Sequence, residues 1–402
     1  MNSYHSRLQR NFKIAYAREA FRYLYFFLPI WYVFESQYAS TATLGLIYAI
    51  THLITVGLEL PTGALADLLG RKRTLIIGLA LEAFSWLFIS QSQNVYWLWI
   101  GYSINALAVS LISGADTALH YDSLKELGQE TNYSRFSANL GLVVRISITI
   151  STFLGGFIFR FNHRLPYIAV GICGLVGAAI ATGYQEPKID TEKFNLANYL
   201  HQTKLGFKQL FKTAYIRDFS IYYISVGGIG WYFVYFLNQV FATDLGFNEI
   251  DRSWIFGFIY LISGLTIIYL ARAKWLKRPY VYLGIPLMMI VGLLPGFWYH
   301  KNLLAIIGIL LVQLPSLARF SLLDQYANLE FDSKYRATAV SALNMLVSVS
   351  FAAASIIGGR VILATNTGFL MTALGILLIC TSIPSALILI YKHHRQPAPV
   401  PI

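Results

Sequence analysis

Most of this chain consists of apolar stretches that are long enough to cross a membrane as helices. The hydrocarbon core of a bilayer needs roughly 20 helical residues at about 1.5 Å per residue. Charged residues make up only 12 % of the chain, whereas soluble domains typically carry about 25 %. The chain is therefore predicted to be an all-α integral membrane protein with twelve spans, at about 14–35, 43–66, 74–90, 95–118, 134–159, 165–183, 218–243, 253–273, 279–299, 303–326, 336–363 and 366–391.

The basic residues between these stretches predict the orientation of the chain. If the amino terminus is cytoplasmic, 24 of the 31 lysines and arginines fall in segments on the cytoplasmic side and 5 on the opposite side. Cytoplasmic loops of membrane proteins carry an excess of lysine and arginine. Both termini are therefore expected in the cytoplasm. The net charge of +12 is spread over short connectors, which argues against a nucleic-acid-binding face.

The spans divide into two halves of six. We expect an N-terminal bundle over 1–183, a cytoplasmic linker over 184–217 and a C-terminal bundle over 218–402. The linker is polar and basic, and it places Phe207, Leu210 and Phe211 at helical spacing, which predicts an amphipathic helix on the membrane surface. Each half has an acid, then a base, then a glycine pair in the same order, which indicates an internal repeat.

The turn between the second and third spans carries the most specific motif. Gly63, Asp67, Gly70, Arg71 and Lys72 stand at fixed spacing in a short connector. They closely resemble the pattern Gly-x-x-x-Asp-(Arg/Lys)-x-Gly-Arg-(Arg/Lys) between helices 2 and 3 of the major facilitator superfamily. The resemblance implies that superfamily's fold, with 12 transmembrane helices in two pseudo-symmetric six-helix bundles. It also implies secondary transport by alternating access, in a multi-pass protein of the bacterial cytoplasmic membrane.

The resemblance further implies a cytoplasmic gate. In the superfamily the acid of this turn pairs with the arginine of the turn, with an acid of span 4 and with a base of span 11. These pairs hold the two halves together when the cavity faces outward. The alternative is that the basic residues of the turn only set the orientation. Carried over to this chain, the gate comprises Gly63, Asp67, Gly70, Arg71, Asp122 and Arg336.

Five of the ionisable residues inside predicted spans of the first half are candidates for a functional role. A charge at the bilayer centre costs about 2.5–3.5 kcal/mol on insertion scales, so each needs a partner or a wet cavity. We expect Glu59 or Asp116 to exchange protons, with Arg22 or Arg145 adjusting the pKa or holding an anionic group. The alternative is a structural set of ion pairs that fixes helix packing. The five candidates are Arg22, Glu59, Glu82, Asp116 and Arg145.

The second half offers polar and aromatic candidates for a substrate cavity. Gly227, Gly228 and Gly230 weaken the helix of the seventh span, and irregular backbone is tolerated where it lines a cavity. Aromatic rings beside such a break are suited to stacking on an organic substrate, although most aromatic residues of this chain are expected to face lipid or other helices. The cavity candidates are Trp231, Tyr235, Asn238, Gln313 and Asn344.

These patterns favour a proton-coupled transporter that exports a small organic compound, a drug or a metabolite. Uptake or exchange of an organic anion is the alternative suggested by Arg22 and Arg145, and a transport-inactive scaffold is a third reading. The Gly-Pro pair and the span-4 arginine of related antiporters are missing. No nucleotide-binding motif, His/Cys cluster or catalytic nucleophile motif occurs. We therefore expect no enzyme activity, no cofactor and no metal, and a monomer that contacts lipids and a small-molecule substrate.

Overall fold

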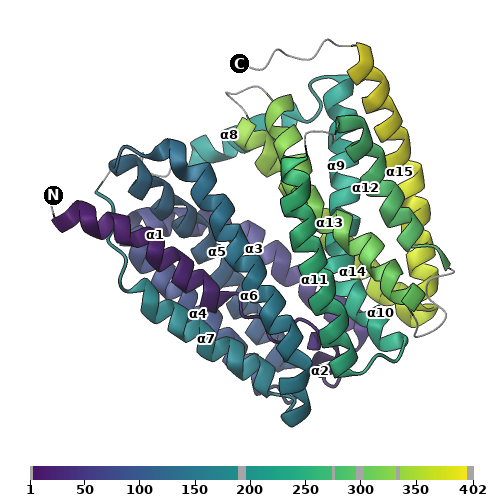
Figure 1. Ribbon diagram of the computed structural model, residues 1–402, viewed down its shortest axis with the longest axis horizontal. Coiled ribbons are helices and arrows are strands. Elements are labelled where there is room, and N and C mark those ends of the chain that lie inside the picture. The colour runs from purple at the N-terminus through teal and green to yellow at the C-terminus, as the bar shows by residue number, and fades with distance from the viewer. Residues whose placement is uncertain (1–2, 189–195, 274–276, 296–302, 332–335, 396–402) are drawn as a thin grey trace. The chain divides into compact units, whose positions relative to one another are not determined.

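The computed structural model describes residues 3–188, 196–273, 277–295, 303–331 and 336–395 of the 402-residue chain (Figure 1). These residues are almost entirely helical and form no β-strand, which confirms the predicted all-α class. Nine of the helices in this part of the chain are long and apolar enough to cross a membrane. The helices α7 and α12 lie on two further predicted spans but have only 17 and 15 residues.

The helices follow the predicted spans closely. In the first half they are α1 (Ser3–Arg22), α2 (Trp31–Glu35), α3 (Thr41–Leu69), α4 (Arg71–Ser90), α5 (Val95–Glu126), the 3-10 turn η1 (Glu130–Asn132), α6 (Tyr133–Phe161) and α7 (Leu165–Ala181). The linker contains α8 (Leu196–Gln209). The second half contains α9 (Ala214–Tyr232), η2 (Phe233–Leu237), α10 (Asn238–Asp244), α11 (Glu249–Arg272), α12 (Arg278–Gly292), α13 (Leu303–Glu330), α14 (Arg336–Ala364) and α15 (Thr367–Arg395).

The first predicted span is not one continuous helix. After α1 ends at Arg22, the chain runs through tight turns before α2 begins. The N–H of Tyr25 donates to the carbonyl of Tyr23 at 2.9 Å, so the helical ladder is lost there. Pro29 contributes to the break because it has no N–H and disfavours helical geometry at the residue before it. In the second half the seventh span is also irregular, since η2 is a π-helical segment inserted between α9 and α10.

The chain forms two compact units that do not coincide with its two halves. Unit 1 comprises Met1–Ser40, Ile50–Leu196 and Asn248–Leu261, and unit 2 comprises Thr41–Ala49, Ala197–Phe247 and Ile262–Ile402. Each unit therefore includes the start of one helix from the other half of the sequence. In unit 1, α4 packs against α5 and α7, and α1 packs against α6 and α7, around a shared apolar core.

The glycine pair of α6 permits two very close backbone contacts within unit 1. A Cβ atom on Gly155 would overlap the carbonyl oxygen of Phe26, in the irregular segment after α1. A Cβ atom on Gly156 would overlap the carbonyl oxygen of Glu249, in the first turn of α11. The N–H of Gly156 also donates to Ser253 Oγ at 2.6 Å. Only glycine fits at either position, which explains why the repeated order of acid, base and glycine pair ends in two glycines.

The glycine pair of α14 makes the corresponding contacts within unit 2. A Cβ atom on Gly358 would overlap the Tyr232 hydroxyl, at the end of α9, and one on Gly359 would overlap the backbone of Ala42, at the start of α3. In both units the first glycine faces the first span of its own half. The second glycine faces the start of a helix from the other half. This repeated packing is independent structural evidence for the internal repeat.

Candidate functional site

The turn between α3 and α4 positions the charged residues of the motif. Gly70 adopts φ 88°, a conformation that side chains with a Cβ rarely adopt, and α4 begins at the next residue. The guanidinium of Arg71 forms an ion pair with the buried carboxylate of Asp122 on α5, and it donates to the carbonyl of Ala118 at 3.1 Å. Two of the predicted gate residues are therefore in direct contact.

The other predicted gate residues are placed as follows. Gly63 and Asp67 lie outside the residues of α3 whose surroundings the structure describes. Arg336 is the first residue of α14 and is exposed. It belongs to unit 2, whereas Asp122 belongs to unit 1. The pairing of Arg336 with the acids of the first half therefore stays a prediction.

Glu186 caps the start of α4 and was not singled out from the sequence. Its two carboxylate oxygens accept the backbone N–H groups of Arg71 and Lys72, each at 2.7 Å. The first N–H groups of a helix have no partner within the helix, and its positive dipole end attracts a carboxylate. Because Glu186 lies 115 residues from Arg71, local sequence patterns cannot reveal the contact.

The segment around Glu186 is tied to the rest of unit 1 by further hydrogen bonds. Tyr4 Oη donates to the Glu186 carbonyl oxygen at 3.3 Å. Partial burial and the neighbouring Glu126 carboxylate raise the pKa of Tyr4 to about 12, so its phenol stays a neutral donor at physiological pH. Asn11 Nδ2 donates to the carbonyl of Gln185 at 2.9 Å. The start of the linker is thus fixed onto the end of the bundle that carries the motif.

Replacing Glu186 by glutamine tests this cap. The variant removes the charge that faces the helix dipole and weakens two charge-assisted hydrogen bonds. We expect the free energy of unfolding to fall by about 0.5–2 kcal/mol, the range found for lost helix caps. Thermal unfolding of the purified protein in detergent measures the change. Glu130→Gln is the control, because Glu130 is exposed; an equal loss of stability in both variants would contradict the capping role.

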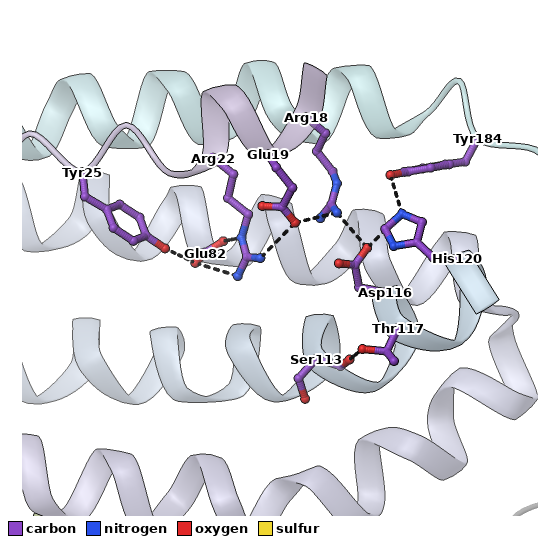
Figure 2. A network of polar contacts seen from close by, with 10 residues as sticks. All are labelled: Arg18, Glu19, Arg22, Tyr25, Glu82, Ser113, Asp116, Thr117, His120 and Tyr184. Carbon is purple, nitrogen blue, oxygen red and sulfur yellow. Dashed lines mark hydrogen bonds and ion pairs between the residues drawn. The ribbon is translucent and has the colours of Figure 1, made fainter. Parts of the chain in front are cut away.

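A buried network of charged side chains connects α1, α4 and α5 within unit 1 (Figure 2). At one end Arg22 pairs with Glu82 through two contacts, Nε to Oε2 at 2.7 Å and Nη2 to Oε1 at 3.2 Å. Tyr25 Oη donates to the same carboxylate at 3.3 Å. Arg22 and Glu82 are only 8 % and 4 % exposed. Two of the five charged residues that were selected from the sequence therefore form an ion pair with each other.

The other end of the network contains Asp116 and two residues that were not singled out from the sequence. Arg18 Nη2 lies 2.6 Å from Glu19 Oε1 and 2.8 Å from Asp116 Oδ1. Arg22 Nη1 lies 3.7 Å from the same Glu19 oxygen, which joins the two ends. Arg18 and Arg22 are four residues apart and share one face of α1, a spacing that could have drawn attention to Arg18.

His120 extends the network toward the end of α7. Its Nε2 atom lies 3.6 Å from Asp116 Oδ1 and 3.2 Å from the hydroxyl of Tyr184. Figure 2 shows these side chains in a row from Tyr25 to Tyr184. Groups that can bind or release a proton thus follow one another along the interior of unit 1.

The remaining two charged candidates of the first half lie apart from this row. Glu59 is exposed on α3, and Arg145 is partly buried on α6. Among the residues that the structure describes, no ion pair or side-chain hydrogen bond joins either of them to the network. The network therefore includes Arg22, Glu82 and Asp116 of the five predicted residues.

Unit 2 holds a second polar cluster, on α9, α10, α13 and α14. Tyr223 Oη lies 2.5 Å from Asp324 Oδ1 and 3.0 Å from Asn344 Oδ1. Since one hydroxyl proton serves one acceptor, we assign it to the Asp324 carboxylate and turn the Asn344 amide so that its nitrogen donates. Asn238 Nδ2 donates to Gln313 Oε1 at 3.1 Å. The structure thus pairs two of the predicted cavity residues with each other.

Aromatic rings surround a buried arginine in the same cluster. Arg319 on α13 is 0 % exposed, and its guanidinium carbon lies 5.5 Å from the ring centre of Tyr223 and 5.9 Å from that of Trp231. Such cation–π contacts contribute about 0.5–2 kcal/mol each. Trp231 also packs edge-on against Tyr235, with ring centres 5.9 Å apart, and Tyr235 is half exposed. The cluster combines a positive charge with aromatic faces.

Comparisons with known proteins agree with this fold. A family profile described as Major Facilitator Superfamily matches residues 18–355. A solved structure of the nucleoside transporter NupG aligns with a TM-score of 0.70 at 15 % identity, over 98 % of this chain and 99 % of that one. The human organic anion transporter MFSD10 aligns with a TM-score of 0.63 at 14 % identity, over 95 % of this chain and 99 % of that one. At these identities the alignments show the fold alone.

Two curated relatives have names that refer to resistance. Multidrug resistance protein MdtH of Baumannia cicadellinicola subsp. Homalodisca coagulata is 23 % identical over 251 residues, 61 % of this chain and 57 % of MdtH. Quinolone resistance protein NorA of Staphylococcus aureus is 24 % identical over 184 residues, 45 % of this chain and 46 % of NorA. The matched region therefore spans about half the length of these relatives.

Proposed function

The chain belongs to the major facilitator superfamily, and on this premise we propose that it is a secondary transporter that exports a small organic compound in exchange for protons. It is a multi-pass membrane protein, and we place it in a bacterial cytoplasmic membrane. The direction of transport rests on its relatives MdtH and NorA, whose names refer to multidrug and quinolone resistance. Alternating access of a central site to the two sides of the membrane is the proposed mechanism.

The observation that carries proton coupling is the buried network of unit 1. Burying a charge away from water is costly, so charges inside a membrane protein are retained mostly where they serve a function. Glu82 and Asp116 lie on different helices, and each contacts an arginine of α1. A carboxylate held between arginines and a histidine can change its protonation when its neighbours move. We therefore assign proton exchange to this network and not to the exposed Glu59.

Proton coupling is tested with Asp116→Asn in proteoliposomes that have an acidic lumen. Addition of a quinolone or of another drug cation to wild-type vesicles is expected to alkalinise the lumen, because each exported proton is exchanged for substrate. In Asp116→Asn vesicles, we expect this signal to fall at least about tenfold, because the loss of one carboxylate changes the charge of the whole network and with it the uptake of a proton. A fluorescent pH indicator in the lumen measures the change. The matched control, Asp251→Asn, alters a partly buried acid in the first turn of α11 that lies outside the network.

The opposite result would redirect the assignment. If Asp116→Asn alkalinises the lumen as fast as wild type does, Asp116 takes no part in coupling. If no compound of a broad panel produces a pH signal in the wild type, while labelled substrate still exchanges, the transporter is not coupled to protons. A protein without any exchange would be a scaffold.

The second candidate function is uptake or exchange of an organic anion. It is favoured by Arg319, which places a buried positive charge between the rings of Tyr223 and Trp231 in unit 2. A planar carboxylate or phosphate ester would find both an ionic partner and a stacking surface there. The panel used for the vesicle experiment separates the two functions. Accumulation of aromatic anions without alkalinisation of the lumen would support anion transport over drug export.

A further inference from the structure

The buried network of unit 1 contains unequal numbers of acidic and basic groups. Its carboxyl groups are Glu19, Glu82 and Asp116, and its guanidinium groups are Arg18 and Arg22. With all three acids ionised and His120 neutral, the network carries one excess negative charge. An uncompensated charge in an apolar interior is so costly that the group takes up a proton instead.

Among the residues that the structure describes, the ionic contacts of the network join only its own members. Where α7 faces α1, it presents Gly177, which lies beside the carbonyl oxygen and the Cγ atom of Arg18 and the Cβ atom of Arg22. The groups with a proton to gain or lose that surround the network are otherwise tyrosines and one histidine: Tyr23, Tyr25, Tyr133, His120 and Tyr184. Tyrosines are neutral at physiological pH. The extra proton must therefore reside on a carboxyl group or on His120.

The three carboxyl groups differ in how well their charge is compensated. Glu82 accepts two contacts from Arg22 and one from Tyr25, so both of its carboxylate oxygens face hydrogen-bond donors. Asp116 is held by Arg18 at 2.8 Å and has His120 within 3.6 Å. Glu19 shares one oxygen with the arginines, while its Oε2 atom is buried and has no hydrogen-bond partner among the described residues. The residue itself is 3 % exposed.

We propose that this network holds a single exchangeable proton and that Glu19 carries it. The proton on Glu19 Oε2 leaves two carboxylates facing two guanidinium groups, so the buried charges balance. When the proton leaves, Glu19 and Asp116 compete for the same nitrogen, Nη2 of Arg18. Release of the proton thereby pulls on a contact between α1 and α5. The inference deepens the proposed function, on which its role in transport rests, but the protonation of Glu19 stands by itself.

Infrared spectroscopy of the purified full-length protein tests the proposal without a substrate. A protonated carboxyl group has a carbonyl stretching band that an ionised carboxylate lacks. Near neutral pH we expect such a band from Glu19 in the wild type, and we expect the spectrum of Glu19→Gln to lack it. Glu130→Gln removes an exposed carboxyl and is expected to retain the band. Glu19→Asp keeps a carboxyl and is expected to show the band at a shifted frequency.

A second variant tests the charge count itself. Asp116→Asn leaves Glu19 in place but equalises the acids and the bases of the network. Glu19 should then ionise, so the band is expected to disappear although its carboxyl is still present. Persistence of the band in Glu19→Gln would assign the proton to another group, and persistence in Asp116→Asn would show that charge balance does not set protonation. Either result overturns the proposal.

The spectra and the vesicle experiment fail independently. If the band behaves as expected but the wild type produces no proton signal with any compound, the inference holds and the proposed coupling falls. If the wild type alkalinises the vesicle lumen but the band is absent, coupling stands and Glu19 is not the carrier. His120→Asn separates the remaining possibility. If the wild type has no carboxyl band and the His120→Asn variant no longer alkalinises the vesicle lumen, the proton resides on His120.

Discussion

Replacing Arg22 by methionine is expected to destabilise the protein by about 3–5 kcal/mol, which is the cost of leaving one member of a buried ion pair unpaired. Glu82 would lose both of its contacts with the guanidinium, at 2.7 Å and 3.2 Å, and would keep only the hydroxyl of Tyr25. The methionine fills much of the same volume, so little of the effect would come from a cavity. Denaturant unfolding in detergent, followed by circular dichroism, measures the loss.

A double-mutant cycle separates the ion pair from other effects of this substitution. Adding Glu82→Gln to Arg22→Met removes the unpaired charge, so the double variant should recover part of the lost stability. Arg10→Met is the matched control, because Arg10 is exposed near the start of α1. If Arg22→Met unfolds at the same denaturant concentration as Arg10→Met, the pair seen in the structure does not contribute to stability.

Replacing Arg71 by glutamine is expected to slow transport by roughly tenfold or more. The substitution breaks the buried pair with Asp122 and the hydrogen bond to the carbonyl of Ala118, and a broken buried pair costs about 3–5 kcal/mol. If the predicted gate depends on this pair, its loss displaces Asp122 and the motif turn within unit 1 and thereby disturbs the gate. The initial rate of substrate exchange in proteoliposomes measures the effect, at equal amounts of inserted protein.

Arg73→Gln is the control for this prediction. Arg73 lies two residues further along the same helix and carries the same charge, but it is exposed. Its replacement should leave the rate within a factor of two of the wild type. Equal rates in Arg71→Gln and the wild type would mean that the motif arginine acts only on the orientation of the chain. Equal losses in both variants would attribute the effect to net charge.

The bounds of most helices were predictable because each apolar stretch is about as long as a membrane span. The second span was expected at about 43–66, and α3 covers Thr41–Leu69. The two irregular segments were harder to place. The glycines 227, 228 and 230 suggested a weak point in the seventh span, but they lie in regular helix, and the π-helical segment begins at Phe233. Gly230 instead permits close packing against Ser316 of α13.

The site was predictable only as far as the cost of buried charge could identify it. Arg22, Glu82 and Asp116 were selected because charges inside spans need partners, and all three are in the network. Their pairing depends on how α1, α4 and α5 rotate about their axes, which the sequence alone does not specify. Arg18 and Glu19 also lie inside the predicted first span, about 14–35, so the same criterion applied to every charge of that span would have selected them. Glu186 lies in a polar linker, where a charged residue is expected to be solvated and does not indicate a contact.

The composition of unit 1 has a consequence for how the protein is made. This unit includes Asn248–Leu261, so its set of packing partners is complete only after about two thirds of the chain has been synthesised, although domains generally fold as they emerge. Until then Gly156 of α6 has no carbonyl of Glu249 and no hydroxyl of Ser253 to face. These contacts of the N-terminal half can therefore form only after α11 has been synthesised.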